Sequence, residues 1–254
     1  MRILLTNDDG IYAPGLESLE KIAREISDDI WIVAPESEQS GASHSLSLAD
    51  PIRLRAIGER RVAVKGTPTD CVVMAVRKIM PAPPDLVLSG VNRGQNLADD
   101  VTYSGTIAAA MEGAALGFKS VALSQVSGIF NRRGLTFDVA EAHGAKVIQR
   151  LCTMEFGPGV LINVNFPDCR PDEVQGVEAT RQGKRDQNLL IVDERIDARD
   201  RPYYWLGFKR ERGNAPAGTD LKAAFEKRIS VTPLHMNLTQ LEALEPLRAA
   251  LDEM

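Results

Sequence analysis

Two adjacent carboxylates follow a short apolar run near the start of the chain. Asp8 and Asp9 come after residues 3–5, and Gly10 directly behind them would end a β-strand there. Side chains of a strand alternate between its two faces, but in a turn both carboxylates can face one cation. Carboxylate oxygens are hard ligands that suit Mg²⁺ or Mn²⁺ better than Zn²⁺. The alternative is a plain strand-end turn in which one aspartate caps the next helix.

Two further loops rich in Ser, Asn and Gly also follow predicted strands. The first contains Ser40, whose hydroxyl is a candidate metal ligand, and the second, residues 89–96, contains Asn92 and Asn96. In an open parallel sheet, ligands bind outside the carboxyl ends of the strands. We expect the three loops to meet at this edge, and their meeting favours a metal site over a structural turn.

A candidate phosphate site lies where Ser104, Gly105 and Thr106 precede an alanine-rich helical pattern. The free N–H groups and the positive end of the helix dipole at such a terminus attract anions. The alternative is a serine that simply caps its own helix, which is common. With Asn92 and Asn96 nearby, both interpretations stay open.

The elements that must hold these loops alternate between strands and helices. The expected strands are residues 3–5, 30–33, 62–64, 85–88, 121–123 and 160–164, and the expected helices are residues 15–26, 68–80, 104–116 and 138–151. Strands that alternate with helices of this length predict an α/β fold built from parallel βαβ units with right-handed crossovers. A last strand at 229–232 and a helix from 238 to the C-terminus complete the expected elements.

The strongly charged stretch from 180 to 214 interrupts this pattern. We interpret it as a protruding hairpin, or as an arm that packs on a partner subunit. Tyr203, Tyr204 and Trp205 lie within it. Large aromatic side chains dominate subunit contacts, so we expect an interface here rather than a surface that stacks a base.

The composition excludes several classes of protein. Apolar residues make up 44% of the chain and charged residues 26%, which is ordinary for a globular domain, and the net charge is −5. That charge argues against binding to a nucleic-acid polymer or an anionic membrane.

The sequence lacks several motifs that mark other classes of enzyme. These are the Rossmann glycine fingerprint, the P-loop, H-E-x-x-H and the G-x-S-x-G elbow. An odd cysteine count without C-x-x-C, and a start without a signal-peptide core, predict a cytoplasmic protein.

Taken together, the motifs closely resemble those of the SurE family of stationary-phase survival proteins. The matching segments are residues 6–11 (TNDDGI), 13–15 (APG), 40–43 (SGAS), 66–71 (GTPTDC), 89–92 (SGVN) with Gly94 and Asn96, and 103–106 (YSGT). Beyond residue 125 the resemblance is one of outline, through 163–167 (NVNFP) and 231–234 (VTPL).

The resemblance implies a Rossmann-like three-layer α/β sandwich with a mostly parallel sheet, forming a single domain over residues 1–254. Residues 1–125 would form the metal- and phosphate-binding core. Residues from about 126 to 254 would complete the sheet and carry a hairpin arm used in oligomerisation and a C-terminal helix. The resemblance further implies a homodimer or homotetramer, since family members typically form dimers or tetramers that exchange C-terminal segments.

The resemblance also implies the residues of the site. One divalent cation per subunit, Mg²⁺ or Mn²⁺, would be held by Asp8, Asp9, Ser40 and Asn92. The phosphate pocket would be lined by Asn96, Ser104, Gly105 and Thr106. The implied activity is hydrolysis of nucleoside 5'-monophosphates, with 3'-monophosphates and short polyphosphate as further substrates.

Two mechanisms remain open at the level of sequence. The nucleophile is either a water molecule activated at the metal site, with Asp8 as general base, or the carboxylate of Asp8 itself. We expect the first. A different class of function is a regulatory module that binds metal and nucleotide without turnover. A serine hydrolase that uses Ser40 or Ser104 would need a histidine base with an orienting partner, and the sequence shows none.

Overall fold

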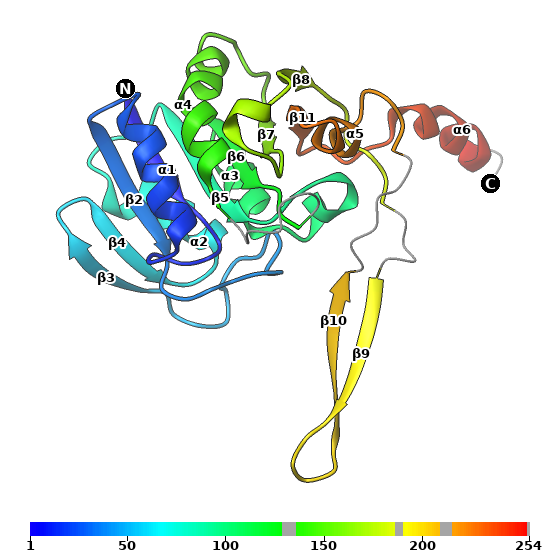
Figure 1. Cartoon of the computed structure of the whole chain (residues 1–254), viewed down its shortest axis with the longest axis horizontal. Helices are drawn as coiled ribbons and strands as arrows, with labels where there is room; N and C mark the ends of the chain where they lie inside the picture. Colours follow the sequence, from blue (N-terminus) through cyan, green and yellow to red (C-terminus); the bar gives the residue numbers. More distant parts are fainter. Residues whose placement is uncertain (129–135, 186–189, 209–214, 253–254) are drawn as a thin grey trace.

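The computed structural model describes residues 1–128, 136–185, 190–208 and 215–252. Its centre is a nine-stranded sheet of order β3-β4-β2-β1-β5-β6-β7-β11-β8 (Figure 1). The strands of this sheet are β1 (Arg2–Thr6), β2 (Asp29–Pro35), β3 (Arg53–Gly58), β4 (Arg61–Lys65), β5 (Leu86–Arg93), β6 (Lys119–Gln125), β7 (Val160–Phe166), β8 (Val177–Ala179) and β11 (Ile229–His235). The α-helices are α1 (Pro14–Arg24), α2 (Pro68–Met74), α3 (Gly105–Ala115), α4 (Asp138–Cys152), α5 (Asp220–Phe225) and α6 (Leu241–Asp252).

The six strands from β4 to β7 run parallel, which confirms the predicted α/β fold. At the two ends of this group, β3 pairs antiparallel with β4 and β11 pairs antiparallel with β7. The order of the strands reverses at β1: β2 and β4 lie on one side of it, and β5, β6 and β7 on the other. Such a switch point leaves a crevice at the carboxyl ends of the strands, and this is where open α/β sheets bind ligands.

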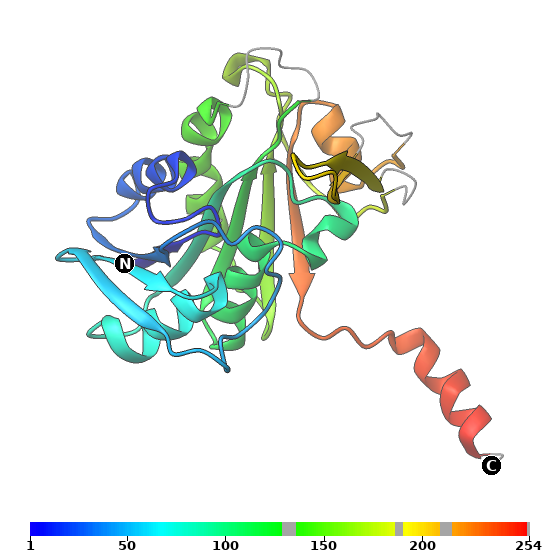
Figure 2. The same cartoon turned by 90° about the horizontal axis from the view of Figure 1, so that it is seen from below.

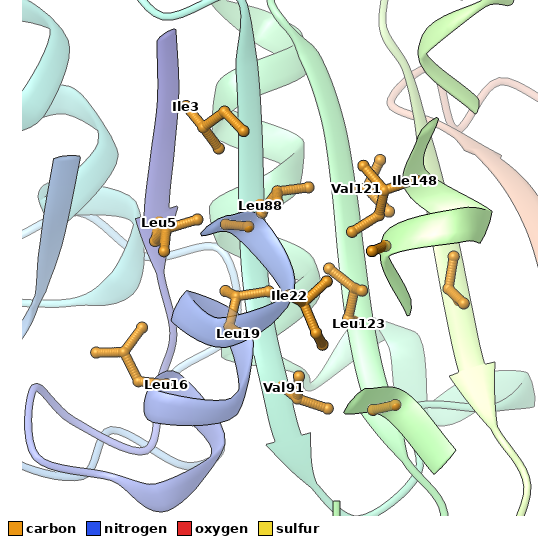
Figure 3. Close-up of a cluster of buried hydrophobic side chains, with 14 of the residues drawn as sticks. Ile3, Leu5, Leu16, Leu19, Ile22, Leu88, Val91, Val121, Leu123 and Ile148 are labelled. Atoms are coloured by element: carbon orange, nitrogen blue, oxygen red, sulfur yellow. The ribbon is translucent and has the colours of Figure 1, made fainter. Parts of the chain in front are cut away.

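Helices cover both faces of the sheet, with α1 and α4 on one face and α2 and α3 on the other (Figures 1 and 2). Helix α1 packs inward through one apolar face: Leu16, Leu19 and Ile22 are fully buried against strand residues such as Leu5 and Leu88 (Figure 3). Burying such a side chain contributes roughly 1.5–3 kcal/mol. The layered core therefore holds the strand ends, and the loops that follow them, in place.

The fifth strand is longer than the sequence predicts. It was expected to end at Leu88, but β5 continues to Arg93, and its register with β6 shifts between Ser89 and Asn92. Val91 in the extension is fully buried, so apolar packing prolongs the strand across the glycine that precedes it. The prediction that Asn92 lies in a loop is therefore wrong, because Asn92 pairs with Ser124 of β6 near the end of the strand.

Several elements escaped the sequence patterns. Strand β3 is an edge strand with mostly exposed side chains, so no alternation of apolar and polar residues marks it. Strand β8 and helix α5 are too short to show a period. The helix expected to continue to Met80 is α-helical only to Met74, and a π-helical turn follows over Ala75–Ile79.

Two elements project from the body. The hairpin expected within the charged stretch is confirmed for β9 (Leu190–Ile196) and β10 (Pro202–Phe208), which pair antiparallel and extend away from the sheet (Figure 1). Residues 186–189 and 209–214 of that stretch lie outside the described residues. The C-terminal helix α6 also stands clear of the core (Figure 2). None of the helices in the described ranges has the length and apolar character needed to cross a membrane.

Candidate active site

The turn that carries the two aspartates is held by the residue before them. The carboxamide of Asn7 accepts a hydrogen bond from the Gly10 N–H at 3.2 Å and donates one to the Gly10 carbonyl at 2.9 Å. Asn7 is fully buried, and Gly10 has a φ of +105°, a backbone conformation that favours glycine. The chain therefore leaves β1 in a defined loop that presents Asp8 and Asp9 together.

Asp8 lies against the first turn of α3. The Thr106 hydroxyl donates to Asp8 Oδ1 at 2.5 Å. Asp8 is only 5% exposed, and this burial raises its pKa to about 6 against the opposing effect of the Thr106 hydroxyl. The neighbouring charge of Asp9 raises the pKa further. The site thus holds a carboxylate whose negative charge is only partly compensated.

Gly105 makes this close approach possible. A β-carbon at Gly105 would lie 2.7 Å from the Asp8 β-carbon and 3.0 Å from Asp8 Oδ2. No other residue type fits without moving the helix or the carboxylate. The family resemblance implies that Gly105 lines the phosphate pocket, and in the structure this glycine also makes room for Asp8.

Asp9 is half-buried and contacts the end of β5. The Arg93 N–H donates to Asp9 Oδ2 at 3.2 Å. Burial raises the pKa of Asp9, and the negative charge of Glu38 acts in the same direction. The contact with Arg93 brings Asp9 beside Asn92, the preceding residue, whose Nδ2 donates to the Gly94 carbonyl at 3.1 Å. The sequence did not indicate that Arg93 and Glu38 lie beside Asp9, because neither residue belongs to a motif typical of metal or phosphate ligands.

The loop after β2 lies beside the same edge. The Gln39 N–H donates to the Asp8 carbonyl at 2.8 Å, which places Ser40 next to the aspartate turn. The Ser40 hydroxyl is exposed and donates to Glu38 Oε1 at 2.8 Å. Further along, the Ser43 hydroxyl donates to the Thr102 carbonyl at 2.8 Å, so this loop also reaches the segment that leads into α3.

Ser104 caps α3. Its hydroxyl accepts a hydrogen bond from the Ile107 N–H at 3.1 Å. The alternative considered for this serine, that it caps its own helix, is therefore confirmed. Asp8 contacts Gly105 and Thr106 directly. Asp9 contacts Arg93, the neighbour of Asn92, and Asp8 contacts Gln39, the neighbour of Ser40, so these residues lie at the same edge of the sheet. The roles of these residues in binding metal and phosphate remain predictions.

The donors gathered here suit a hard cation. Within the ranges that the structure describes, no three His, Cys, Asp or Glu side chains are grouped to hold a metal. A cation at this edge would therefore take the carboxylates of Asp8 and Asp9, which burial has made hard to ionise, together with neutral oxygens. That set fits Mg²⁺ or Mn²⁺.

His44 and His143 each contact a group other than the candidate metal ligands. His44 pairs with Glu112 of α3, with Nε2 and Oε2 3.0 Å apart. Nε2 of His143, on α4, lies 3.1 Å from the Pro171 carbonyl.

The fold and site together define an α/β protein with paired carboxylates packed on a helix N-terminus at the switch point of a parallel sheet. The family model described as "Survival protein SurE" matches residues 3–189. The chain belongs to the SurE family, which confirms the resemblance seen in its motifs.

Individual relatives match along the whole chain. A protein of Methylobacterium radiotolerans named 5'-nucleotidase SurE is 60% identical over 254 residues, which cover 100% of both chains. One of Parvibaculum lavamentivorans with the same name is 58% identical over 252 residues, covering 99% of this chain and 91% of the relative. The crystal structure of the SurE protein from Aquifex aeolicus matches with a TM-score of 0.85 at 35% identity, covering 98% of this chain and 99% of that one.

Proposed function

We propose that this chain is a cytoplasmic, divalent-metal-dependent phosphatase that hydrolyses nucleoside 5'-monophosphates to nucleoside and phosphate. Nucleotidase activity, the broader part of this assignment, is supported by full-length relatives about 60% identical that carry the name 5'-nucleotidase SurE. One structural observation supports metal-dependent hydrolysis of a phosphate ester. The buried carboxylate of Asp8 is held by the first turn of α3, where a cation and a phosphate can be bound side by side.

The residues that would hold the cation are Asp8, Asp9, Ser40 and Asn92. Mg²⁺ or Mn²⁺ bound there would neutralise charge on the phosphate and make an attacking water more acidic. Its two carboxylate ligands have pKa values raised mainly by burial, so a cation would stabilise their ionised forms.

The chain's own groups would orient the reaction. Thr106 holds Asp8 Oδ1, which leaves Oδ2 to accept the proton of the attacking water. Asp8 is buried against the helix terminus that would bind the phosphate, and its second oxygen is free of Thr106, which favours water with Asp8 as general base over direct attack by Asp8. The N–H groups of the first turn of α3, together with Asn96, Ser104, Gly105 and Thr106, would receive the phosphate oxygens.

Further parts of the proposal concern partners. Nucleoside 3'-monophosphates and short polyphosphate present the same terminal phosphate, and we include them as substrates. The net charge of −5 disfavours a nucleic-acid polymer or an anionic membrane as partner. We propose a single domain that assembles as a homodimer or homotetramer through the projecting hairpin and α6.

The decisive experiment measures phosphate release from a panel of nucleoside monophosphates and an aryl phosphate, with Mn²⁺, with Mg²⁺ and with EDTA. We expect release with metal and none in the chelator, and the panel ranks the substrates. Asp8→Asn should lower turnover at least 100-fold, because the proton acceptor and a charged ligand are lost. Its circular dichroism spectrum should match that of the wild type.

Two outcomes would contradict the proposal. Undiminished release in EDTA would exclude the metal, and turnover of Asp8→Asn close to that of the wild type would exclude Asp8 as the base. If folded protein bound nucleotide but released no phosphate with any metal, the chain would be a regulatory binding module instead.

A further inference from the structure

A buried polar network surrounds Asn96, a residue predicted to line the phosphate pocket. Asn163 and Asn165 of β7 contact its main chain. The Asn96 N–H donates to Asn165 Oδ1 at 2.9 Å. The Asn96 carbonyl accepts from Asn163 Nδ2 at 2.8 Å and from Asn165 Nδ2 at 3.1 Å. Asn163 and Asn165 are both fully buried, so they hold the loop before α3 from inside the protein.

The side chain of Asn96 is held by a different strand. Its Nδ2 donates to the Ser124 hydroxyl at 2.8 Å, and Ser124 is fully buried near the end of β6. Asn165 Nδ2 also donates to Asn163 Oδ1 at 3.2 Å, so the two β7 asparagines orient each other. Both the position of the Asn96 main chain and the direction of its carboxamide are thereby determined.

The strand register explains how these groups come together. In the pairing of β6 with β7, Ala122 is opposite Asn163 and Ser124 is opposite Asn165. Residues two apart on a strand face the same side, so the two asparagines and Ser124 form one polar patch on a sheet covered on both faces. Buried polar groups cost free energy unless they are hydrogen-bonded, and the partner that these three share is Asn96.

We propose that Ser124, Asn163 and Asn165 are positioning residues that orient Asn96 toward the substrate phosphate. The inference rests on the proposed function, in which Asn96 lines the phosphate pocket. The Ser124 hydroxyl accepts a hydrogen bond from one of the two N–H groups of the Asn96 carboxamide. This fixes the orientation of the carboxamide, so that its second N–H group can point toward the phosphate. The two asparagines prevent the loop from shifting, so Asn96 is in place before the phosphate arrives.

The first test is Ser124→Ala. Loss of this hydrogen bond should raise the KM for a nucleoside monophosphate and the inhibition constant of inorganic phosphate by about tenfold. The kcat should stay within about twofold of the wild type, because the metal ligands and Asp8 are untouched. The matched control is Ser120→Ala, on the same strand and face, whose hydroxyl donates to the Phe118 carbonyl at 3.0 Å far from the site. It should leave both constants unchanged.

A double-mutant cycle separates positioning from a general structural role. Asn96→Ala should weaken phosphate binding by itself, and Ser124→Ala should then add nothing, because the side chain that it orients is gone. Asn165→Ala, which removes contacts to the main chain, should still weaken binding in either background. Thermal unfolding of each variant reports loss of stability independently of the kinetic constants.

The outcomes distinguish this inference from the proposed function. A wild-type protein that releases no phosphate would contradict the function, and the affinities for inorganic phosphate, measured calorimetrically, would still test the positioning. Wild-type constants in Ser124→Ala would overturn the inference. Effects of Ser124→Ala and Asn96→Ala that simply add would do the same, since they would show that Ser124 does not act through Asn96.

Discussion

The pKa of Asp8 results from two opposing interactions. Burial disfavours the ionised carboxylate, whereas the hydrogen bond from the Thr106 hydroxyl favours it. Burial prevails and raises the pKa from 3.8 to about 6, a difference of about 3 kcal/mol between the two protonation states. Without a cation, the folded protein therefore carries a destabilising charge at neutral pH. A divalent metal would remove this penalty, which links folding stability to metal binding.

We predict a specific pH dependence for the metal-free protein. Because the pKa of Asp8 is higher in the folded state, its contribution to stability is fully present below pH 3.8 and is lost as the pH rises through about 6. Urea unfolding in EDTA should show the free energy of unfolding of the wild type falling relative to that of Asp8→Asn by about 2 kcal/mol between pH 4 and pH 7. Parallel curves for the two proteins would contradict the shift.

At the scale of elements, the site depends on how closely α3 approaches the end of β1. The helix begins at Gly105, and its first turn contacts Asp8 through Thr106. The free N–H groups of that turn are the proposed phosphate donors, so one helix terminus serves both the carboxylate and the substrate. A small displacement of α3 would disturb both functions together.

Gly105→Ala tests this packing. The added methyl group would lie 2.7 Å from the Asp8 β-carbon, so either the helix or the carboxylate must move. Overpacking of this kind costs about 1–3 kcal/mol, and we expect a lower melting temperature and a loss of phosphate release of at least 100-fold. The control is Gly58→Ala, whose methyl group would have its nearest neighbour at 3.8 Å. Activity retained in Gly105→Ala would show that the close approach is not required.

At the scale of the whole molecule, the C-terminal half supports the loop that leads to the site. The buried carboxylate of Asp220 accepts from the Ala98 N–H at 2.8 Å, and Gln182 Nε2 donates to the Ala98 carbonyl at 3.0 Å. The Arg185 N–H donates to Asp99 Oδ2 at 2.8 Å. The segment that ends at residue 185 is thus joined to the segment just before α3, so residues beyond 125 also help to position the proposed phosphate site.

The projecting hairpin carries large apolar side chains that are exposed in the part of the chain that the structure describes. Trp205 is 59% exposed and Leu206 is 74% exposed. Large apolar side chains left exposed on both faces of a projecting hairpin indicate an interaction site, and we propose a second copy of this chain as the partner. Replacing both residues with serine should shift the mass measured by light scattering toward a smaller assembly. Met154→Ser, at a half-exposed methionine on the body, should leave the mass unchanged. An unaltered mass in the double variant would contradict assembly through the hairpin.

The sequence by itself determined the features that depend on residues close together in the chain. Alternating apolar runs and helical periods predicted the parallel sheet, because periodicity records which side of an element is buried. The serine cap of α3 and the turn at Gly10 follow from the hydrogen bonding and backbone freedom of a few neighbouring residues. The motifs that carried the family resemblance lie in these same turns and caps.

Only the tertiary structure decided the features that depend on contacts between distant segments. Thr106 reaches Asp8 across 98 residues of chain, and the asparagines of β7 reach Asn96 across 67 and 69. The raised pKa of Asp8 likewise reflects burial that no local pattern encodes. Strand β3 and the extension of β5 to Arg93 exist because a neighbouring strand completes their hydrogen bonds. A pattern within a few residues reports burial and turns, whereas the partner of a buried polar group is determined by how the whole chain packs.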